Sequence, residues 1–150
     1  MKLYLSGPMT GLFNYNRQSF DDAEATLKNL GFEVINPANL PEPVVPSKPT
    51  PAESWAAYLV RDILLLQEER PDFVVLLPGA EHSNGSCLES RYAKEIGLAT
   101  ITLGEFLSAT YRNEKPEGYK YSFPWPRKTA AQTHPTPKGV DINECSETHN

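Results

Sequence analysis

The sequence has little of what several protein classes require. It contains two cysteines, Cys87 and Cys145, and three histidines among 150 residues, and none of these shows metal-ligand spacing. Two cysteines are too few for a disulfide framework and indicate a reducing compartment. The sequence shows no signal peptide and no apolar stretch long enough to span a bilayer. We therefore expect a soluble cytoplasmic protein with no metal and no other cofactor.

The chain also lacks an excess of positive charge. Its net charge of −5 gives no reason to expect duplex nucleic acid or an anionic membrane as a partner. There is no P-loop, no dinucleotide glycine fingerprint and no serine nucleophile elbow. A phosphate ligand stays compatible with the acidic charge, because backbone N–H groups at a helix N-terminus can hold one without a basic patch.

What the sequence does have is an alternation of strands and helices. Short apolar runs predict strands at residues 3–5, 32–35, 73–77 and 99–103. Between and after them, apolar residues at helical spacing predict amphipathic helices. The third predicted helix follows Gly85 and is expected to carry these residues inward: Leu88, Tyr92, Ala93 and Ile96. The alternation predicts a parallel sheet with helices on both faces.

The prolines divide the chain. Residues 37–51 contain six of the fourteen prolines, which excludes regular helix or central strand there. From about residue 112 the periodicity stops, so we expect a domain over residues 1–111 and a partly disordered arm over residues 112–150. Four aromatic side chains of this arm are expected to pack on the body or on a neighbouring subunit. They are Tyr119, Tyr121, Phe123 and Trp125.

The most informative segment is the glycine turn that leads to Glu89. We expect Glu89 in the first turn of its helix, where the helix dipole favours the ionised form. A carboxylate at the carboxyl end of a parallel strand lies where open α/β sheets bind ligands, and it could attack a sugar carbon. A plainer interpretation is open too, because Ser86 and Glu89 have the spacing of a capping box.

Other candidate residues allow two interpretations each. Asp62 lies near the polar edge of its predicted helix, so it is either a solvated carboxylate or a ligand contact. Trp55 is either part of the core or a side chain that stacks on a base. His82 is expected at the surface. The loops at residues 7–11 and 78–89 and at Asn36 should meet at one sheet edge, although each loop alone is a weak signal.

Together, several segments resemble the nucleoside 2-deoxyribosyltransferase superfamily, and more specifically a small, phage-rich branch with a Gly-Pro-Met-x-Gly loop. The segments cover roughly residues 2 to 104 and are Leu3-Tyr4-Leu5-Ser6-Gly7-Pro8-Met9-Thr10-Gly11, Val34-Ile35-Asn36-Pro37, Trp55 with Arg61-Asp62, Leu77-Pro78-Gly79 and Gly85-x-x-x-Glu89. The resemblance implies a flavodoxin-like or Rossmann-like three-layer sandwich with a parallel sheet of four to five strands. It also implies a nucleoside or nucleotide pocket at the sheet edge.

The resemblance assigns roles to individual residues. Glu89 would attack the anomeric carbon of a 2-deoxyribose, Tyr4 would orient Glu89, and Asp62 would hold the sugar hydroxyls. The remaining expected ligand contacts are Gly7, Pro8, Met9, Thr10, Asn36, Trp55, Gly79, Ser83, Asn84, Gly85 and Ser86. One departure is Ser83, which stands where the transferases usually have an aspartate that helps the base to leave. A serine hydroxyl is not a general acid near neutral pH.

Two functions follow as expectations. One is an enzyme that cleaves or transfers the N-glycosidic bond of a deoxynucleoside or deoxynucleotide through Glu89. The other is a non-catalytic sponge that sequesters a cyclic nucleotide signal of bacterial defence, since the phage branch resembles Thoeris anti-defence proteins. In both cases the resemblance implies a homo-oligomer, a dimer or a tetramer, and host cytoplasm if the chain is phage-encoded.

Overall fold

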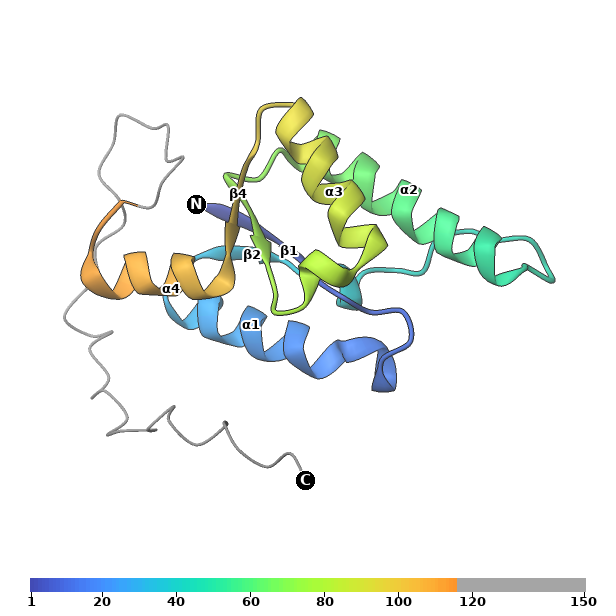
Figure 1. The fold of residues 1–150 in the computed structure, drawn as a ribbon, viewed down its shortest axis with the longest axis horizontal. Helices are drawn as coiled ribbons and strands as arrows, with labels where there is room; N and C mark the ends of the chain where they lie inside the picture. Colours follow the sequence, from blue (N-terminus) through green and yellow to red (C-terminus); the bar gives the residue numbers. More distant parts are fainter. Residues whose placement is uncertain (116–150) are drawn as a thin grey trace, which may run out of the picture.

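The computed structural model describes residues 1–115, and the expected aromatic contacts and disorder of the C-terminal arm lie outside this range. The protein is an α/β three-layer sandwich of the flavodoxin-like or Rossmann-like type (Figure 1). Its elements are β1 (Lys2–Ser6), η1 (Phe13–Asn16), α1 (Arg17–Asn29), β2 (Glu33–Ile35), η2 (Pro37–Asn39), α2 (Pro51–Glu69), β3 (Phe73–Leu76), η3 (Ala80–His82), α3 (Asn84–Glu95), β4 (Ala99–Thr102) and α4 (Leu103–Arg112).

The sheet has four parallel strands in the order β2-β1-β3-β4. In this order the chain moves outward from β1 to β2 and then crosses back to β3. The strand order therefore reverses between β1 and β3, whose carboxyl ends lie side by side at the pair Ser6 and Leu76. Open α/β sheets bind ligands outside such a point, and we call this position the β1–β3 crevice. The backbone N–H of Leu77 donates to the carbonyl of Ser6 at 2.8 Å and extends this pairing by one step.

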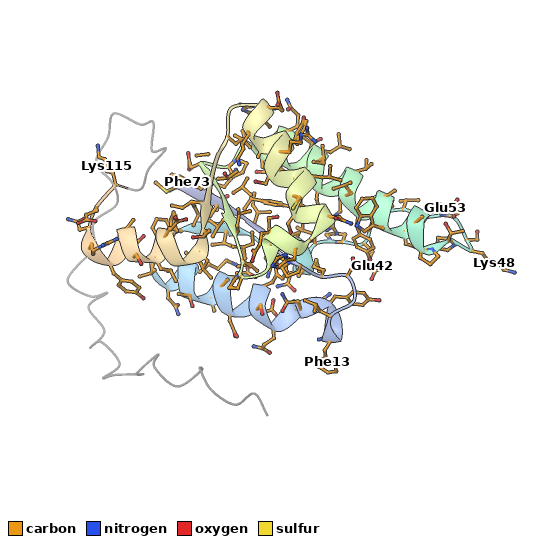
Figure 2. The ribbon with its side chains drawn as sticks, in the orientation of Figure 1. Phe13, Glu42, Lys48, Glu53, Phe73 and Lys115 are labelled. Atoms are coloured by element: carbon orange, nitrogen blue, oxygen red, sulfur yellow. The ribbon has the colours of Figure 1, made fainter. Side chains whose placement is uncertain are left out.

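The two faces of the sheet carry separate cores. Leu3 and Leu5 of β1 pack on one face with side chains of α1 and α4, including Phe106. Tyr4 points to the other face and packs with Leu66 of α2 and with side chains of α3. Figure 2 shows Phe73 inside the molecule among side chains of this interior, whereas Phe13, which is 97% exposed, points away from it. Side chains alternate along β1, so Tyr4 and Ser6 share the face covered by α2 and α3.

The α3 helix begins earlier in the turn than the sequence suggested. Ser83 is its N-cap and its hydroxyl accepts from the N–H of Ser86 at 3.3 Å, so Glu89 lies in the second turn. The predictions of a first-turn Glu89 and of a Ser86–Glu89 capping box are therefore wrong. Leu88 is 40% exposed, contrary to its expected inward position, whereas Glu89 is buried against the sheet, where it contacts Ser6 of β1.

The α2 helix begins as its sequence predicts. The Thr50 hydroxyl accepts from the N–H of Glu53, and the Glu53 carboxylate accepts from the N–H of Thr50, which is a complete capping box. Further along, its buried positions are Asp62 and Leu66, so Asp62 is not a solvated surface carboxylate. Within residues 1–115, no helix is long and apolar enough to cross a membrane.

Candidate active site

The centre of the candidate site is the Glu89 carboxyl group. Glu89 is only 7% exposed, and its Oε2 atom accepts a hydrogen bond from the Ser6 hydroxyl at 2.6 Å. Ser6 is the last residue of β1, so this contact joins α3 to the carboxyl end of a central strand. The carboxyl group of Glu89 is therefore fixed at the crevice between β1 and β3 instead of capping its own helix.

A second carboxylate lies close to the first. Asp62 is 6% exposed and its Oδ1 atom pairs with the Arg61 guanidinium, with contacts of 2.7 and 2.8 Å. Arg61 also donates to the carbonyls of Pro37 and Pro41, at 3.1 and 3.0 Å. The guanidinium thus ties α2 to the proline-rich segment and holds the buried negative charge of Asp62 in place.

Tyr4 completes what we call the Glu89 cluster: Tyr4, Ser6, Arg61, Asp62 and Glu89. Its side chain is fully buried, and its hydroxyl has no hydrogen-bond partner among the described residues. The contact of Glu89 is thus made by Ser6, and the expected orienting bond from Tyr4 is not present in this structure. A buried hydroxyl without a partner is costly, so the Tyr4 hydroxyl is a free donor for a ligand or a water molecule.

Burial sets the electrostatics of this cluster. The pKa of Glu89 is raised to about 8: removal from water is the largest cause and the nearby charge of Asp62 acts in the same direction, while the Ser6 hydrogen bond and Arg61 lower it. Burial also raises the pKa of Asp62, against the lowering effect of Arg61. The pKa of Tyr4 lies well above its usual range, first because of burial and then because of the charges of Glu89 and Asp62. Glu89 is therefore protonated in the protein at neutral pH, and is not in the ionised form expected from the helix dipole.

Two glycines shape the loops above the crevice. A Cβ atom added to Gly7 would lie 2.9 Å from the Cβ of Leu77, so only glycine lets the loop after β1 approach the end of β3. Gly79 has a φ of +86°, a left-handed conformation that side chains rarely adopt, and an added Cβ would lie 3.3 Å from Pro8. Both expected ligand contacts therefore have a structural reason to be glycine.

The start of α3 lies beside α2. Trp55 Nε1 would lie 4.0 Å from a Cβ added to Gly85, and Trp55 is 38% exposed. Trp55 thus lies beside the first turn of α3, partly exposed, and is not part of the core. Of the expected contacts here, Asn84 is exposed, and Ser83 is occupied as the helix cap.

The loop after β1 contributes less to this crevice than expected. Thr10 is exposed, whereas Met9 is half-buried against the core on the α1 side of the sheet. The Pro8 carbonyl accepts from the Asn16 amide at 3.0 Å. Asn36 is buried, but its side chain accepts from the N–H of Ala38 and donates to Glu24 at 2.7 Å. The side-chain amide of Asn36 therefore stabilises the turn after β2 through these hydrogen bonds.

A cavity of the described residues lies elsewhere. It measures about 600 Å³ and opens between α3 and α4, beyond the carboxyl ends of β3 and β4. Of the expected ligand contacts it is lined by Gly79 and Ser86 alone, and the Glu89 cluster does not line it. We call this the α3–α4 cavity. The side chains of Tyr4, Asp62 and Glu89 are buried apart from this cavity.

Sequence reasoning missed Ser6 as the partner of Glu89. The available signal was the alternation of β1, which puts Ser6 on the same face as Tyr4, two residues away. Within the described part of the chain, no group of three or more histidine, cysteine or acidic side chains could hold a metal ion.

One comparison with known proteins gives a match. The model of a family described as a domain of unknown function, DUF4406, matches residues 1–102, a segment that contains the whole sheet and the Glu89 cluster. No curated protein and no solved structure matches the chain. Because the matched segment covers more than half of the sequence, the chain belongs to the DUF4406 family.

Proposed function

We propose that this protein binds a nucleoside or nucleotide at the β1–β3 crevice and cleaves or transfers its N-glycosidic bond with Glu89 as the nucleophile. The observation that carries the proposal is the buried Glu89 carboxyl group, which Ser6 fixes at the carboxyl end of a central parallel strand. This is where open α/β sheets bind ligands. The resemblance of the loops to the nucleoside 2-deoxyribosyltransferase superfamily supplies the class of substrate.

The proposed reaction has two displacements. The ionised Glu89 attacks C1′ of the sugar, so that a carboxylate–C1′ ester forms as the C1′–N bond breaks and its electron pair leaves with the base. The departing base takes a proton from solvent. Water, or a second base, then attacks C1′, the carboxylate–C1′ ester bond breaks to release the carboxylate of Glu89, and the attacking group loses its proton to solvent. Splitting one displacement into two is the logic of a retaining glycosidase.

The other residues of the cluster have supporting roles. The free Tyr4 hydroxyl would donate to the sugar or to the reacting carboxylate, and Asp62, held by Arg61, would accept from a sugar hydroxyl. Trp55 beside the first turn of α3 would stack on the base. A ligand contact to the Tyr4 hydroxyl would offset the free-energy cost of burying this group without a hydrogen-bond partner.

The raised pKa makes turnover depend on pH. With a pKa of about 8 for Glu89, only about one tenth of the free protein carries the ionised nucleophile at pH 7. The value of kcat/KM should therefore rise about tenfold per pH unit below pH 8 and level off above it. A flat profile between pH 6 and pH 8 would contradict the assignment of Glu89 as the nucleophile.

A binding protein without chemistry is the second candidate. The protonated state of Glu89 favours it, because a neutral carboxyl group donates a hydrogen bond and does not attack carbon. Ser83 also serves as a helix cap and supplies no acid to the leaving base. On this hypothesis the same crevice would hold a cyclic nucleotide signal unchanged.

One experiment separates the two candidates. The purified full chain is incubated with deoxynucleosides, deoxynucleotides and cyclic nucleotides, and the free and heat-released small molecules are analysed by mass spectrometry. Released base, together with a protein mass increased by one deoxyribosyl group on the peptide containing Glu89, supports the enzyme. An intact nucleotide that is released only by heating supports the binding protein.

The matched control is a second α3 glutamate. Glu89→Gln should abolish base release, while Glu95→Gln, which changes an exposed carboxylate of the same helix, should leave it unchanged. If Glu89→Gln retained full turnover of an accepted substrate, covalent catalysis by Glu89 would be wrong.

A further inference from the structure

We propose that the α3–α4 cavity is a second ligand site, separate from the Glu89 cluster, for a small organic anion with an apolar or aromatic body. Its volume of about 600 Å³ falls in the range of small-molecule sites, roughly 300 to 1,000 Å³. The proposal does not depend on the chemistry of Glu89, because Tyr4, Asp62 and Glu89 do not line this cavity.

One wall of the cavity is apolar. It is formed where β3 ends and α4 begins, by Leu76, Leu77, Pro78 and Leu103. An inorganic ion would leave this surface in contact with water, whereas a hydrocarbon or aromatic body would cover it. The wall therefore favours an organic ligand over a bare phosphate or sulfate.

Another part of the lining is cationic. Arg91 and Lys94 line it from α3 and stand three residues apart, so they lie on one face of the helix. Neither side chain has a hydrogen bond or an ion pair with another residue of the described range. The opposing charge at this cavity is Glu81, whose carboxylate lies 3.5 Å from His82 Nε2. Two such cations in a chain of net charge −5 give the cavity a local preference for an anion.

Two further features point into the same space. The first turn of α4 borders the cavity at Leu103 and Gly104, and the positive end of a helix dipole favours negative charge. Ser86 lines the cavity from α3, is 3% exposed, and its hydroxyl has no partner among the described residues. The anionic group of the ligand is thus expected between the cations and the start of α4, with its body on the apolar wall.

The test uses a pair of fluorescent probes that differ only in charge. These are 8-anilino-1-naphthalenesulfonate, an aromatic sulfonate, and its uncharged parent N-phenyl-1-naphthylamine, titrated into the full-length protein. We expect the sulfonate to bind more tightly than the neutral probe. Arg91→Gln with Lys94→Gln should weaken sulfonate binding about five- to tenfold, the loss of two exposed charge contacts. Binding of the neutral probe should change little.

A third variant fills the cavity. A Cβ added to Gly104 meets no atom within 4 Å and no unusual φ is required there, so Gly104→Phe should fold and block both probes. Bound sulfonate should also slow alkylation of Cys87, which lines the cavity, in a Cys145→Ser background. Circular dichroism and thermal denaturation confirm that each variant is folded before it is titrated.

A control pair of lysines separates binding in the cavity from a general effect of net charge. Lys28→Gln with Lys48→Gln makes the same change in net charge away from the cavity and should leave sulfonate binding unchanged; Lys48 lies at the far end near the start of α2 (Figure 2). Equal losses in the two double variants, or full binding to Gly104→Phe, would overturn the proposal. Glu89→Gln should not alter probe binding, so failure of this site and failure of the proposed reaction are distinguishable.

Discussion

At the scale of single residues, the burial of Glu89 makes the stability of the protein depend on pH. The carboxyl group keeps its proton in the folded state up to a pH of about 8, whereas in the unfolded chain it loses the proton near 4.5. The contribution of neutral Glu89 is therefore fully present below pH 4.5 and is lost as the pH rises toward 8. This loss is on the order of 3 to 5 kcal/mol for a group so deeply buried.

Glu89→Gln should remove this pH dependence, because an amide does not titrate. The free energy of unfolding of the variant should equal or exceed that of the parent at pH 8 and vary less between pH 5 and pH 8. Urea denaturation at several pH values measures both. A parent protein whose stability is constant across this interval would contradict the deep burial of Glu89.

Ser6 tunes the same carboxyl group. Its hydrogen bond lowers the pKa of Glu89 against the larger effect of burial, so Ser6→Ala should raise that pKa further. We expect a shift of about one unit, the size of one charge-assisted hydrogen bond. An NMR titration of the carboxyl carbon, with ¹³C-labelled glutamate, reports the shift directly. A lowered pKa would show that Ser6 is not the partner of the ionised form.

Sequence reasoning at this scale found the carboxylates but not their environment. Glu89 was identified by the glycine turn before it, Asp62 by its place near the polar edge of its helix, and both by resemblance. Their burial depends on how α2 and α3 pack on the same sheet face. Ser6 carried no signal of its own, since a serine at a strand end is common. Its role follows from the 2.6 Å contact with a residue 83 positions away, which no local pattern encodes.

At the scale of elements, the cap of α3 decides where the helix begins. Ser83→Ala removes the acceptor for the N–H of Ser86 and should lower the free energy of unfolding by about 1 kcal/mol. Ser83→Asp retains a good cap and should leave stability near that of the parent. Thermal denaturation of the three proteins compares them.

The same substitution bears on the proposed reaction. An aspartate at position 83 would add the acid that the transferases usually have there, so Ser83→Asp should speed base release while Ser83→Ala should not. If both variants behaved alike in turnover, position 83 would act only as a cap.

The loop after β1 makes a second element-scale prediction. Gly7→Ala would place a methyl group 2.9 Å from the Leu77 Cβ, so we expect a loss of roughly 1 to 3 kcal/mol in the free energy of unfolding. Gly104→Ala is the matched control, because its added Cβ meets nothing and alanine favours a helix. If Gly7→Ala left the free energy of unfolding unchanged, the loop after β1 would be able to move away from Leu77 at little cost.

Elements with strong local signals were predicted well. The capping box of Thr50 and Glu53 and the apolar run at residues 73–77 marked α2 and β3 without help from the rest of the chain. The start of α3 was misjudged because several residues of the segment Ser83-Asn84-Gly85-Ser86 can cap a helix. With Ser83 as the cap, Glu89 lies in the second turn of α3 and is buried, whereas Leu88, which was expected to point inward, is 40% exposed.

At the scale of the whole molecule, the protection of backbone amides against hydrogen exchange should follow the position of each strand in the sheet. The central strands β1 and β3 are fully covered on both faces, while β2 and β4 form the edges of the described sheet. Amide hydrogen exchange should therefore be slowest in residues 3–5 and 73–75 and faster in residues 33–35 and 99–102. Equally slow exchange in β2 would indicate that its outer edge is covered.

The topology follows from the sequence more securely than the site does. Alternating strands and helices leave few arrangements once crossovers are right-handed, and the four-stranded parallel sheet confirms that prediction. The depth and shape of the crevices depend on side chains from four separate segments, so composition and spacing do not determine them.

The edges of the sheet also bear on how two copies of the protein can meet. The β2 strand has three residues and begins at the exposed Glu33, and β4 has four. Such short edges, one of them carrying a charge, offer a foreign strand few backbone groups to pair with. The edges of the described sheet therefore disfavour the recruitment of further strands into a continuous ribbon, which is the route to amyloid-like aggregation.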